Sequence, residues 1–203
     1  MQFYGVGFNS GKFGFKSSHK IEGKWIPFRA YSIWSSMLKR CYSNSPEYLN
    51  YASVTVDPEW HDYQDFALWY ESQPDYRKNN GWQLDKDILG MGLKTYSAKT
   101  CRLVPTQINV LIRKMAERDY TQGVNFHKKH GKLRAYLKGI DGKVIEKNGF
   151  NTELEAFLWY KNQKEAVIRE IANTYKSQLD ADIYNALINY EIISERFKDV
   201  FMS

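Results

Sequence analysis

Residues 123–175 constrain the fold of this chain most, because three short strand patterns are followed there by a strong helix start. The segment 132–138, Lys-Leu-Arg-Ala-Tyr-Leu-Lys, alternates long cationic or aromatic side chains with small or apolar ones. A period of two is typical of a strand with one buried and one outward face. The segments 123–129 and 143–147 fit neighbouring strands, joined to it through the turn signals His130-Gly131 and Asp141-Gly142.

A helix is predicted directly after these strands. Thr152-Glu153-Leu154-Glu155 has the capping-box pattern, in which the Thr and the second Glu satisfy backbone N–H groups at a helix start. The helix is expected to run to about Tyr175. A small basic sheet braced by one helix suits insertion into a DNA major groove, where strands present Arg and Lys to bases and phosphates.

The charge of the chain is concentrated in the same region. Between Arg113 and Lys147 there are ten Lys or Arg and four Asp or Glu, a net +6 that equals the formal charge of the whole chain. The remaining residues are therefore neutral overall. Such a local excess of positive charge indicates a binding site for a polyanion, rather than charge that only keeps the protein soluble.

Composition narrows the protein class further. A chain of 203 residues can form one medium or two small domains, each with its own core. Cys41 and Cys101 stand in unrelated contexts and show no zinc or disulfide spacing. No apolar run has the length of a membrane span, and the N-terminus lacks a signal-peptide core. We therefore expect a cytoplasmic protein without a membrane partner.

The front half is expected to be mainly helical. Residues 1–28 are rich in Gly, Lys and aromatic residues and fit either a loose arm or a short hairpin. Apolar spacing predicts a helix from Arg29 to about Tyr42. A second helix is predicted to start at Asp57, with a core stripe that consists of Trp60, Tyr63, Phe66, Ala67 and Tyr70.

Residues 123–160 resemble a known DNA-binding family. The resemblance rests on Gly123-Val124-x-Phe126-x-Lys128, on Lys132-x-Arg134-Ala135 and on Gly149-Phe150-x-Thr152-x-x-Glu155-Ala156-x-x-x-Tyr160. This run is similar to the plant APETALA-two/ethylene-response-factor DNA-binding domain, in the form found in mobile endonucleases of phages. The resemblance implies that double-stranded DNA is the partner. The expected DNA contacts are Lys128, Lys129, Lys132, Arg134, Tyr136 and Lys138.

A second segment, residues 82–109, resembles the ββα-metal core of HNH endonucleases. Matched position by position, Asp85 and Asn109 stand where that family holds a divalent metal, which implies Mg²⁺ or Mn²⁺ as cofactor. Lys86 stands where the family has its general-base His, and Thr100 where it has the Asn that orients this His. The whole arrangement resembles a phage HNH homing endonuclease.

The replacement of the catalytic His by Lys86 leaves two functions open. A free Lys has a pKa of about 10.4, so it is protonated at neutral pH and cannot accept a proton. Loss of a general base costs about 10²- to 10⁴-fold in rate. The first function is metal-dependent nicking or cleavage of DNA, with His61 as an alternative base. The second is a catalytically inactive DNA-binding or inhibitor protein that acts on a host or phage factor. A third hypothesis is that residues 1–80 bind a protein partner.

The expected fold class is α+β: an HNH-like ββα-metal core with flanking helices, then a small three-stranded antiparallel sheet plus helix domain. We expect an arm at 1–28, a helical lead-in and ββα core at 29–112 and a linker at 113–122. The DNA-binding domain is expected at 123–178, and a C-terminal helix and tail, with Asp180 as helix cap, at 179–203.

Overall fold

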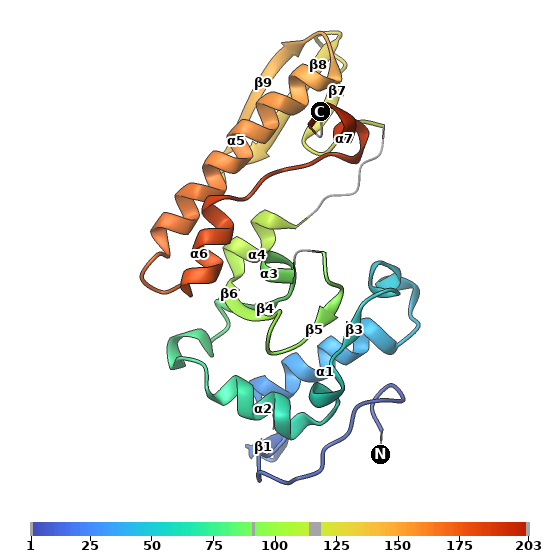
Figure 1. Ribbon diagram of the computed structural model, residues 1–203, viewed down its shortest axis with the longest axis vertical. Helices are drawn as coiled ribbons and strands as arrows, with labels where there is room; N and C mark the ends of the chain where they lie inside the picture. The colour runs from blue at the N-terminus through green and yellow to red at the C-terminus, as the bar shows by residue number, and fades with distance from the viewer. Residues whose placement is uncertain (1, 91, 114–118, 202–203) are drawn as a thin grey trace. The chain divides into compact units, whose positions relative to one another are not determined.

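The computed structural model describes residues 2–90, 92–113 and 119–201, and it has a mixed α+β fold with small sheets (Figure 1). Its contacts divide the chain into two compact units, residues 1–106 and 107–203. Half of the predicted linker 113–122, namely residues 114–118, lies outside the described residues.

The core of the first unit forms where helix α1 (Arg29–Tyr42) packs on helix α2 (Tyr63–Glu71). Trp34, Met37 and Leu38 on α1 are fully buried, and the whole predicted stripe from Trp60 to Tyr70 is buried as well. The Trp34 indole Nε1 donates a hydrogen bond to the Trp60 carbonyl at 2.8 Å. The predicted helix from Arg29 to about Tyr42 is confirmed.

The predicted start of the second helix at Asp57 is wrong. Residues Pro58–His61 form a separate 3₁₀ turn, η2, which Asp57 caps through the Glu59 N–H. Asp62 is extended (φ −82°, ψ 122°), and its carboxylate accepts the Gln64 N–H to start α2. Two capping Asp residues in succession therefore divide the segment into two short elements.

Small strand pairs complete the first unit. Two antiparallel pairs join β1 (Ser18–Ile21) to β2 (Lys24–Pro27) and β4 (Trp82–Asp85) to β6 (Arg102–Pro105). A parallel pair joins β3 (Thr55–Val56) to β5 (Thr95–Tyr96). Three further short helices are η1 (Pro46–Tyr51), η3 (Asp75–Arg77) and α3 (Asp87–Gly90).

The second unit contains the antiparallel sheet β7-β8-β9, formed by β7 (Val124–His127), β8 (Lys132–Lys138) and β9 (Val144–Phe150). Helix α5 (Glu153–Thr174) follows and lies along the sheet (Figure 1). The Thr152/Glu155 capping box is present with both of its hydrogen bonds. The three strands, the helix and the cap are confirmed, but β9 continues to Phe150, beyond the predicted strand 143–147.

One face of the sheet packs against α5. Ala135 and Leu137 of β8 are buried there, together with Phe157 and Tyr160 of α5. Gly123 precedes β7 with a positive φ of 76°, and a Cβ atom at this position would lie 2.1 Å from the Tyr160 ring. Only Gly satisfies both the backbone angle and the close approach of the ring.

The remaining elements of the second unit are α4 (Thr106–Ile112), which starts at the boundary, α6 (Ala181–Ile188), η4 (Glu195–Phe197) and α7 (Lys198–Phe201). Ile183 and Leu187 bury the inner side of α6. Asp180 stands at the N-cap position of α6, but its side chain makes no capping hydrogen bond, in contrast to the prediction. Within 2–90, 92–113 and 119–201, no helix combines the length and the apolar character needed to cross a membrane.

Candidate functional site

The outer side of strand β8 carries the main candidate site. Lys132, Arg134, Tyr136 and Lys138 alternate with the residues that face α5, so all four point to the side of the sheet away from the helix. Lys128 and Lys129 lie in the turn between β7 and β8 and are exposed. We call these six residues the basic face. The structure brings all the DNA-binding candidates of the sequence onto one strand and its adjoining turn.

Arg134 is held in place by its neighbours on this face. Its Nε donates to Asn125 Oδ1 at 3.2 Å, and one terminal nitrogen lies 3.1 Å from Glu146 Oε2. The guanidinium also lies 5.0 Å from the centre of the Tyr136 ring. Asn125 and Glu146 were not predicted as site residues, because finding them requires the pairing of β8 with β7 and β9.

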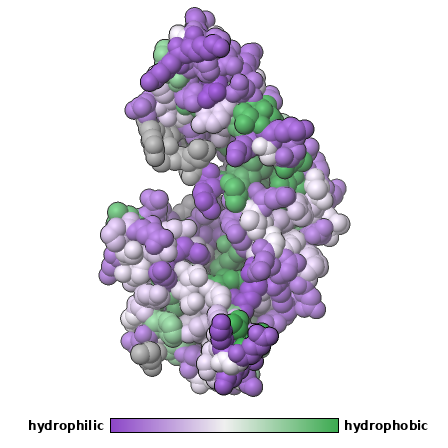
Figure 2. All heavy atoms as spheres, turned by 180° about the vertical axis from the view of Figure 1, so that it is seen from behind, coloured by the Kyte–Doolittle hydropathy of each residue, from purple (hydrophilic) through white to green (hydrophobic). Residues whose placement is uncertain are grey.

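The lysines of the basic face differ in their contacts. Lys132 Nζ bonds Asn151 Oδ1. Among the described residues, no carboxylate forms an ion pair with Lys128, Lys129 or Lys138, and all three are exposed. Figure 2 shows a mostly hydrophilic surface over the part of the second unit that contains this sheet. Exposed cations without internal partners are available for phosphate groups.

The nuclease-like segment has the predicted order of a strand, a second strand and a helix, formed by β4, β6 and α4. Leu84 pairs with Leu103 and Asp85 with Arg102 across the hairpin. Asp85, the predicted metal ligand, is the last residue of β4 and is only 4% exposed. Its Oδ1 accepts the backbone N–H groups of Asp87 at 3.0 Å and Ile88 at 2.9 Å, so the carboxylate holds the start of α3.

The environment of Asp85 disfavours its charge. Burial raises the pKa of this carboxyl to about 6, and the negative charge of Asp87 acts in the same direction. The two N–H hydrogen bonds and the nearby Lys86 partly oppose this shift. Asp85 is therefore a buried helix cap with a weakened preference for ionisation.

Lys86, at the predicted general-base position, is also turned inward. It is 7% exposed, and its Nζ forms an ion pair with Asp87. The same ammonium lies 5.6 Å from the centre of the buried Tyr96 ring. This lysine links α3 to β5 and presents little surface to a substrate.

Thr100, at the predicted orienting position, closes a local turn. Its Oγ1 donates to the Thr95 carbonyl at 2.7 Å and accepts the Ser97 N–H at 3.1 Å. His61, the alternative base, has its Nε2 3.1 Å from the Val56 carbonyl. Each of these polar groups thus has a structural contact in the first unit.

Asn109, the second predicted metal ligand, lies on α4 and belongs to the second unit. In the part of the chain that the structure describes, no group of three or more His, Cys, Asp or Glu is placed to hold a metal ion. Asp85 uses one carboxylate oxygen as a helix cap, and Asp87 pairs with Lys86. In the first unit, these contacts give Asp85 and Asp87 structural roles as a helix cap and an ion-pair partner.

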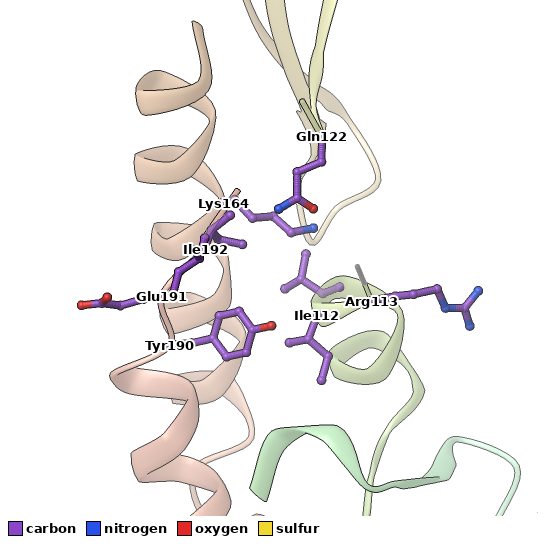
Figure 3. Close-up of a pocket in the computed structure, with 9 residues that line it drawn as sticks. Ile112, Arg113, Gln122, Lys164, Tyr190, Glu191 and Ile192 are labelled. Atoms are coloured by element: carbon purple, nitrogen blue, oxygen red, sulfur yellow. The ribbon is translucent and has the colours of Figure 1, made fainter. Parts of the chain in front are cut away.

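A cavity of about 90 Å³ is present in the second unit, between α5, the end of α4 and residues 190–193 (Figure 3). Lys164 reaches from α5 toward Gln122, and the Tyr190 ring points toward Ile112. Burial lowers the pKa of Lys164 to about 8. None of the residues that line the cavity belongs to the basic face.

Comparison of the chain with models of protein families, with curated proteins and with solved structures finds no match.

Proposed function

We propose that this chain is a double-stranded DNA-binding protein that contacts DNA through the basic face of its β7-β8-β9 sheet. The observation that carries the proposal is the alternation on β8, where Lys132, Arg134, Tyr136 and Lys138 share the side of the sheet opposite α5. A twisted two- or three-stranded ribbon fits the width of a major groove. Arg and Lys on it can contact base edges and phosphates at the same time.

The contacts on this face suggest two functions: base recognition by Arg134 and phosphate binding by the exposed lysines. Arg134 is oriented by Asn125 and Glu146 and stacks near Tyr136, which restricts its rotamers before any ligand binds. A restrained guanidinium suits bidentate contact with guanine. Lys128, Lys129 and Lys138 are exposed and make no ion pair with a described residue, so they suit contact with phosphates.

A salt titration tests this proposal. We expect the affinity of the wild type for a labelled duplex to fall steeply with salt, because bound phosphates release counterions. The variant Lys128→Gln/Lys129→Gln/Lys138→Gln should bind roughly a hundredfold more weakly at low salt and lose about three from the slope of log K against log salt. The matched control is Lys39→Gln/Lys94→Gln/Lys99→Gln, which removes the same charge from exposed positions of the first unit. An equal loss in both variants would refute a specific role of the sheet.

Metal-dependent cleavage is the second candidate function, and the β4-β6-α4 order with Asp85 at the end of the first strand favours it. In the structure, however, Asp85 caps α3 and Lys86 forms an ion pair with Asp87, so all three residues already have structural contacts. We therefore assign no catalytic step to this segment and propose that it is structural. An inhibitor role toward a host or phage factor is compatible with DNA binding, and it is motivated by Lys86 and Thr100 at the positions of the catalytic residues of the resembled family.

A further inference from the structure

The hairpin β1-β2 is the most exposed regular element of the first unit. Its strands pair from Ser18↔Pro27 to Ile21↔Lys24 and are joined by the two residues Glu22 and Gly23. Both loop residues have positive φ, 46° and 81°, as a type I′ hairpin turn requires. This turn has the twist that matches the strands, so the hairpin is a well-formed ribbon rather than a loose arm.

The base of the hairpin is fastened to helix α2. The side-chain amide of the fully buried Gln64 accepts the N–H groups of Phe13 at 3.2 Å and Phe15 at 3.0 Å, and it donates to the Phe15 carbonyl at 2.9 Å. The Tyr63 hydroxyl donates to the Lys16 carbonyl at 3.0 Å. The ribbon is therefore held at its base by α2, and its tip extends into solvent.

Both faces of the ribbon carry large apolar side chains in solvent. Trp25 is 69% exposed and stands directly opposite Lys20 on one face. Ile21 and Ile26 are 50% and 40% exposed and share the other face with Lys24. A two-stranded hairpin gains little stability from side chains that remain in water. An exposed Trp on such a ribbon thus points to a partner rather than to a need of the fold.

The charge of the ribbon identifies the chemistry of that partner. Residues 16–27 contain Lys16, Lys20 and Lys24 and a single acid, Glu22. Among the described residues, none of the three lysines has a carboxylate or hydrogen-bond partner for its ammonium group, and all three are exposed. A basic ribbon with an exposed aromatic side chain complements a polyanion that also offers stacked rings, which is a property of nucleic acid.

We propose that the β1-β2 hairpin is a second DNA contact of this chain, in which Trp25 inserts at a base step of duplex DNA and Lys20 and Lys24 contact phosphates. The ligand in this inference rests on the DNA-binding function proposed above. Large apolar side chains that partly unstack base pairs act as wedges in many groove-binding proteins. The flat indole and the lysine across the strand supply stacking and charge within one cross-strand pair.

The test compares Trp25→Ala with Leu49→Ala, which removes another strongly exposed apolar side chain (71%) from the same unit. We expect Trp25→Ala to weaken duplex binding about tenfold, because stacking of one base on an aromatic side chain has that order of effect. Leu49→Ala should bind like the wild type. Lys20→Gln/Lys24→Gln should lower the salt slope by about two. A duplex with 2-aminopurine should become brighter on binding of the wild type and not of Trp25→Ala.

The outcomes separate this inference from the proposed function. If Trp25→Ala bound DNA as tightly as the wild type, and the wild type gave no 2-aminopurine signal, the hairpin contact would be overturned. The proposal for the basic face would then still stand. No DNA binding by the wild type would overturn both proposals. If the wild type bound anionic lipid vesicles, and Trp25→Ala lost that binding while its DNA binding stayed intact, the hairpin would be assigned to a membrane surface instead. Trp25→Phe, which keeps an aromatic ring, should retain most of the affinity and guards against loss of folding in the Ala variant.

Discussion

The β7-β8-β9 sheet and the β4-β6 hairpin both place charged side chains at positions typical of nucleic-acid enzymes, but they use these charges differently. Lys138 on β8 is exposed and forms no ion pair with a described residue. Asp85 on β4 is buried and caps α3, while Lys86 is buried in an ion pair with Asp87. A charge can act on a ligand only when internal contacts leave it available. We therefore infer different roles for the two regions, although their sequences resemble parts of one kind of enzyme.

The largest expected effect concerns the backbone that supports the basic face. Gly123→Ala forces a Cβ onto a residue with φ 76° and places it 2.1 Å from the Tyr160 ring. Left-handed strain and overpacking together should lower the free energy of unfolding by about 3 kcal/mol or more. Urea denaturation of both proteins measures this loss. The matched control is Gly131→Ala, where φ is 60° but nothing lies within 4 Å, and where only about 1 to 2 kcal/mol is expected. Equal losses would show that the ring contact is unimportant.

Asp85 distinguishes a helix cap from a metal ligand. Asp85→Ala removes the acceptor for the Asp87 and Ile88 N–H groups and should cost about 1 to 2 kcal/mol in unfolding free energy. Asp85→Asn keeps an oxygen for both hydrogen bonds, so at pH 7 it should be at least as stable as the wild type. Thermal unfolding of the three proteins provides the measurement. An Asn variant as unstable as the Ala variant would contradict the capping role.

The same residue predicts a pH dependence with a definite sign. The pKa of Asp85 is raised from 3.8 to about 6 in the folded state, so the folded protein binds more protons between these values. Its contribution to stability is therefore present below about pH 4 and is lost as the pH rises through 6. Asp85→Asn should reduce this loss, which comparison of the two proteins at pH 4.5 and 7 would detect.

The smallest expected effect comes from a lysine that is unlike those of the basic face. Lys164 is half-buried, and burial lowers its pKa from 10.5 to about 8, so the folded state binds fewer protons between these values. Stability from this group should rise with pH across that window. Lys164→Met should stabilise the protein at pH 7 by roughly 1 kcal/mol after allowance for solvent screening. Lys138→Met, at an exposed site, is the control and should change stability little.

The sheet could be predicted from the sequence because its signals are local. Alternation along 132–138, the Asp141-Gly142 turn and the capping box at Thr152 each act within a few residues, and each is present in the structure. The contact between Arg134 and Glu146 could not be predicted in the same way, because it depends on strand register and on the bulge between Leu133 and Arg134.

The roles of the nuclease-like residues could not be read from their spacing. The resemblance matched Asp85 and Lys86 to chemical positions, whereas their burial depends on how Tyr96 and α3 pack around them. Gln64 was not predicted as a structural residue because a polar side chain next to an apolar stripe is expected to be exposed. It is a polar residue beside the apolar stripe of α2, yet it is fully buried and fastens the N-terminal arm. A Gln among core positions of a helix was the available signal.

The central claim is that the basic face binds DNA while the β4-β6 segment has a structural role. Its most direct test incubates the purified protein with supercoiled plasmid in Mg²⁺ or Mn²⁺ and in chelator, beside Asp85→Asn, which keeps the helix cap. We predict an intact plasmid whose migration is retarded in a salt-sensitive manner, with or without metal and equally in the variant. Metal-dependent nicking by the wild type that Asp85→Asn abolishes would contradict the claim and make this segment a working nuclease.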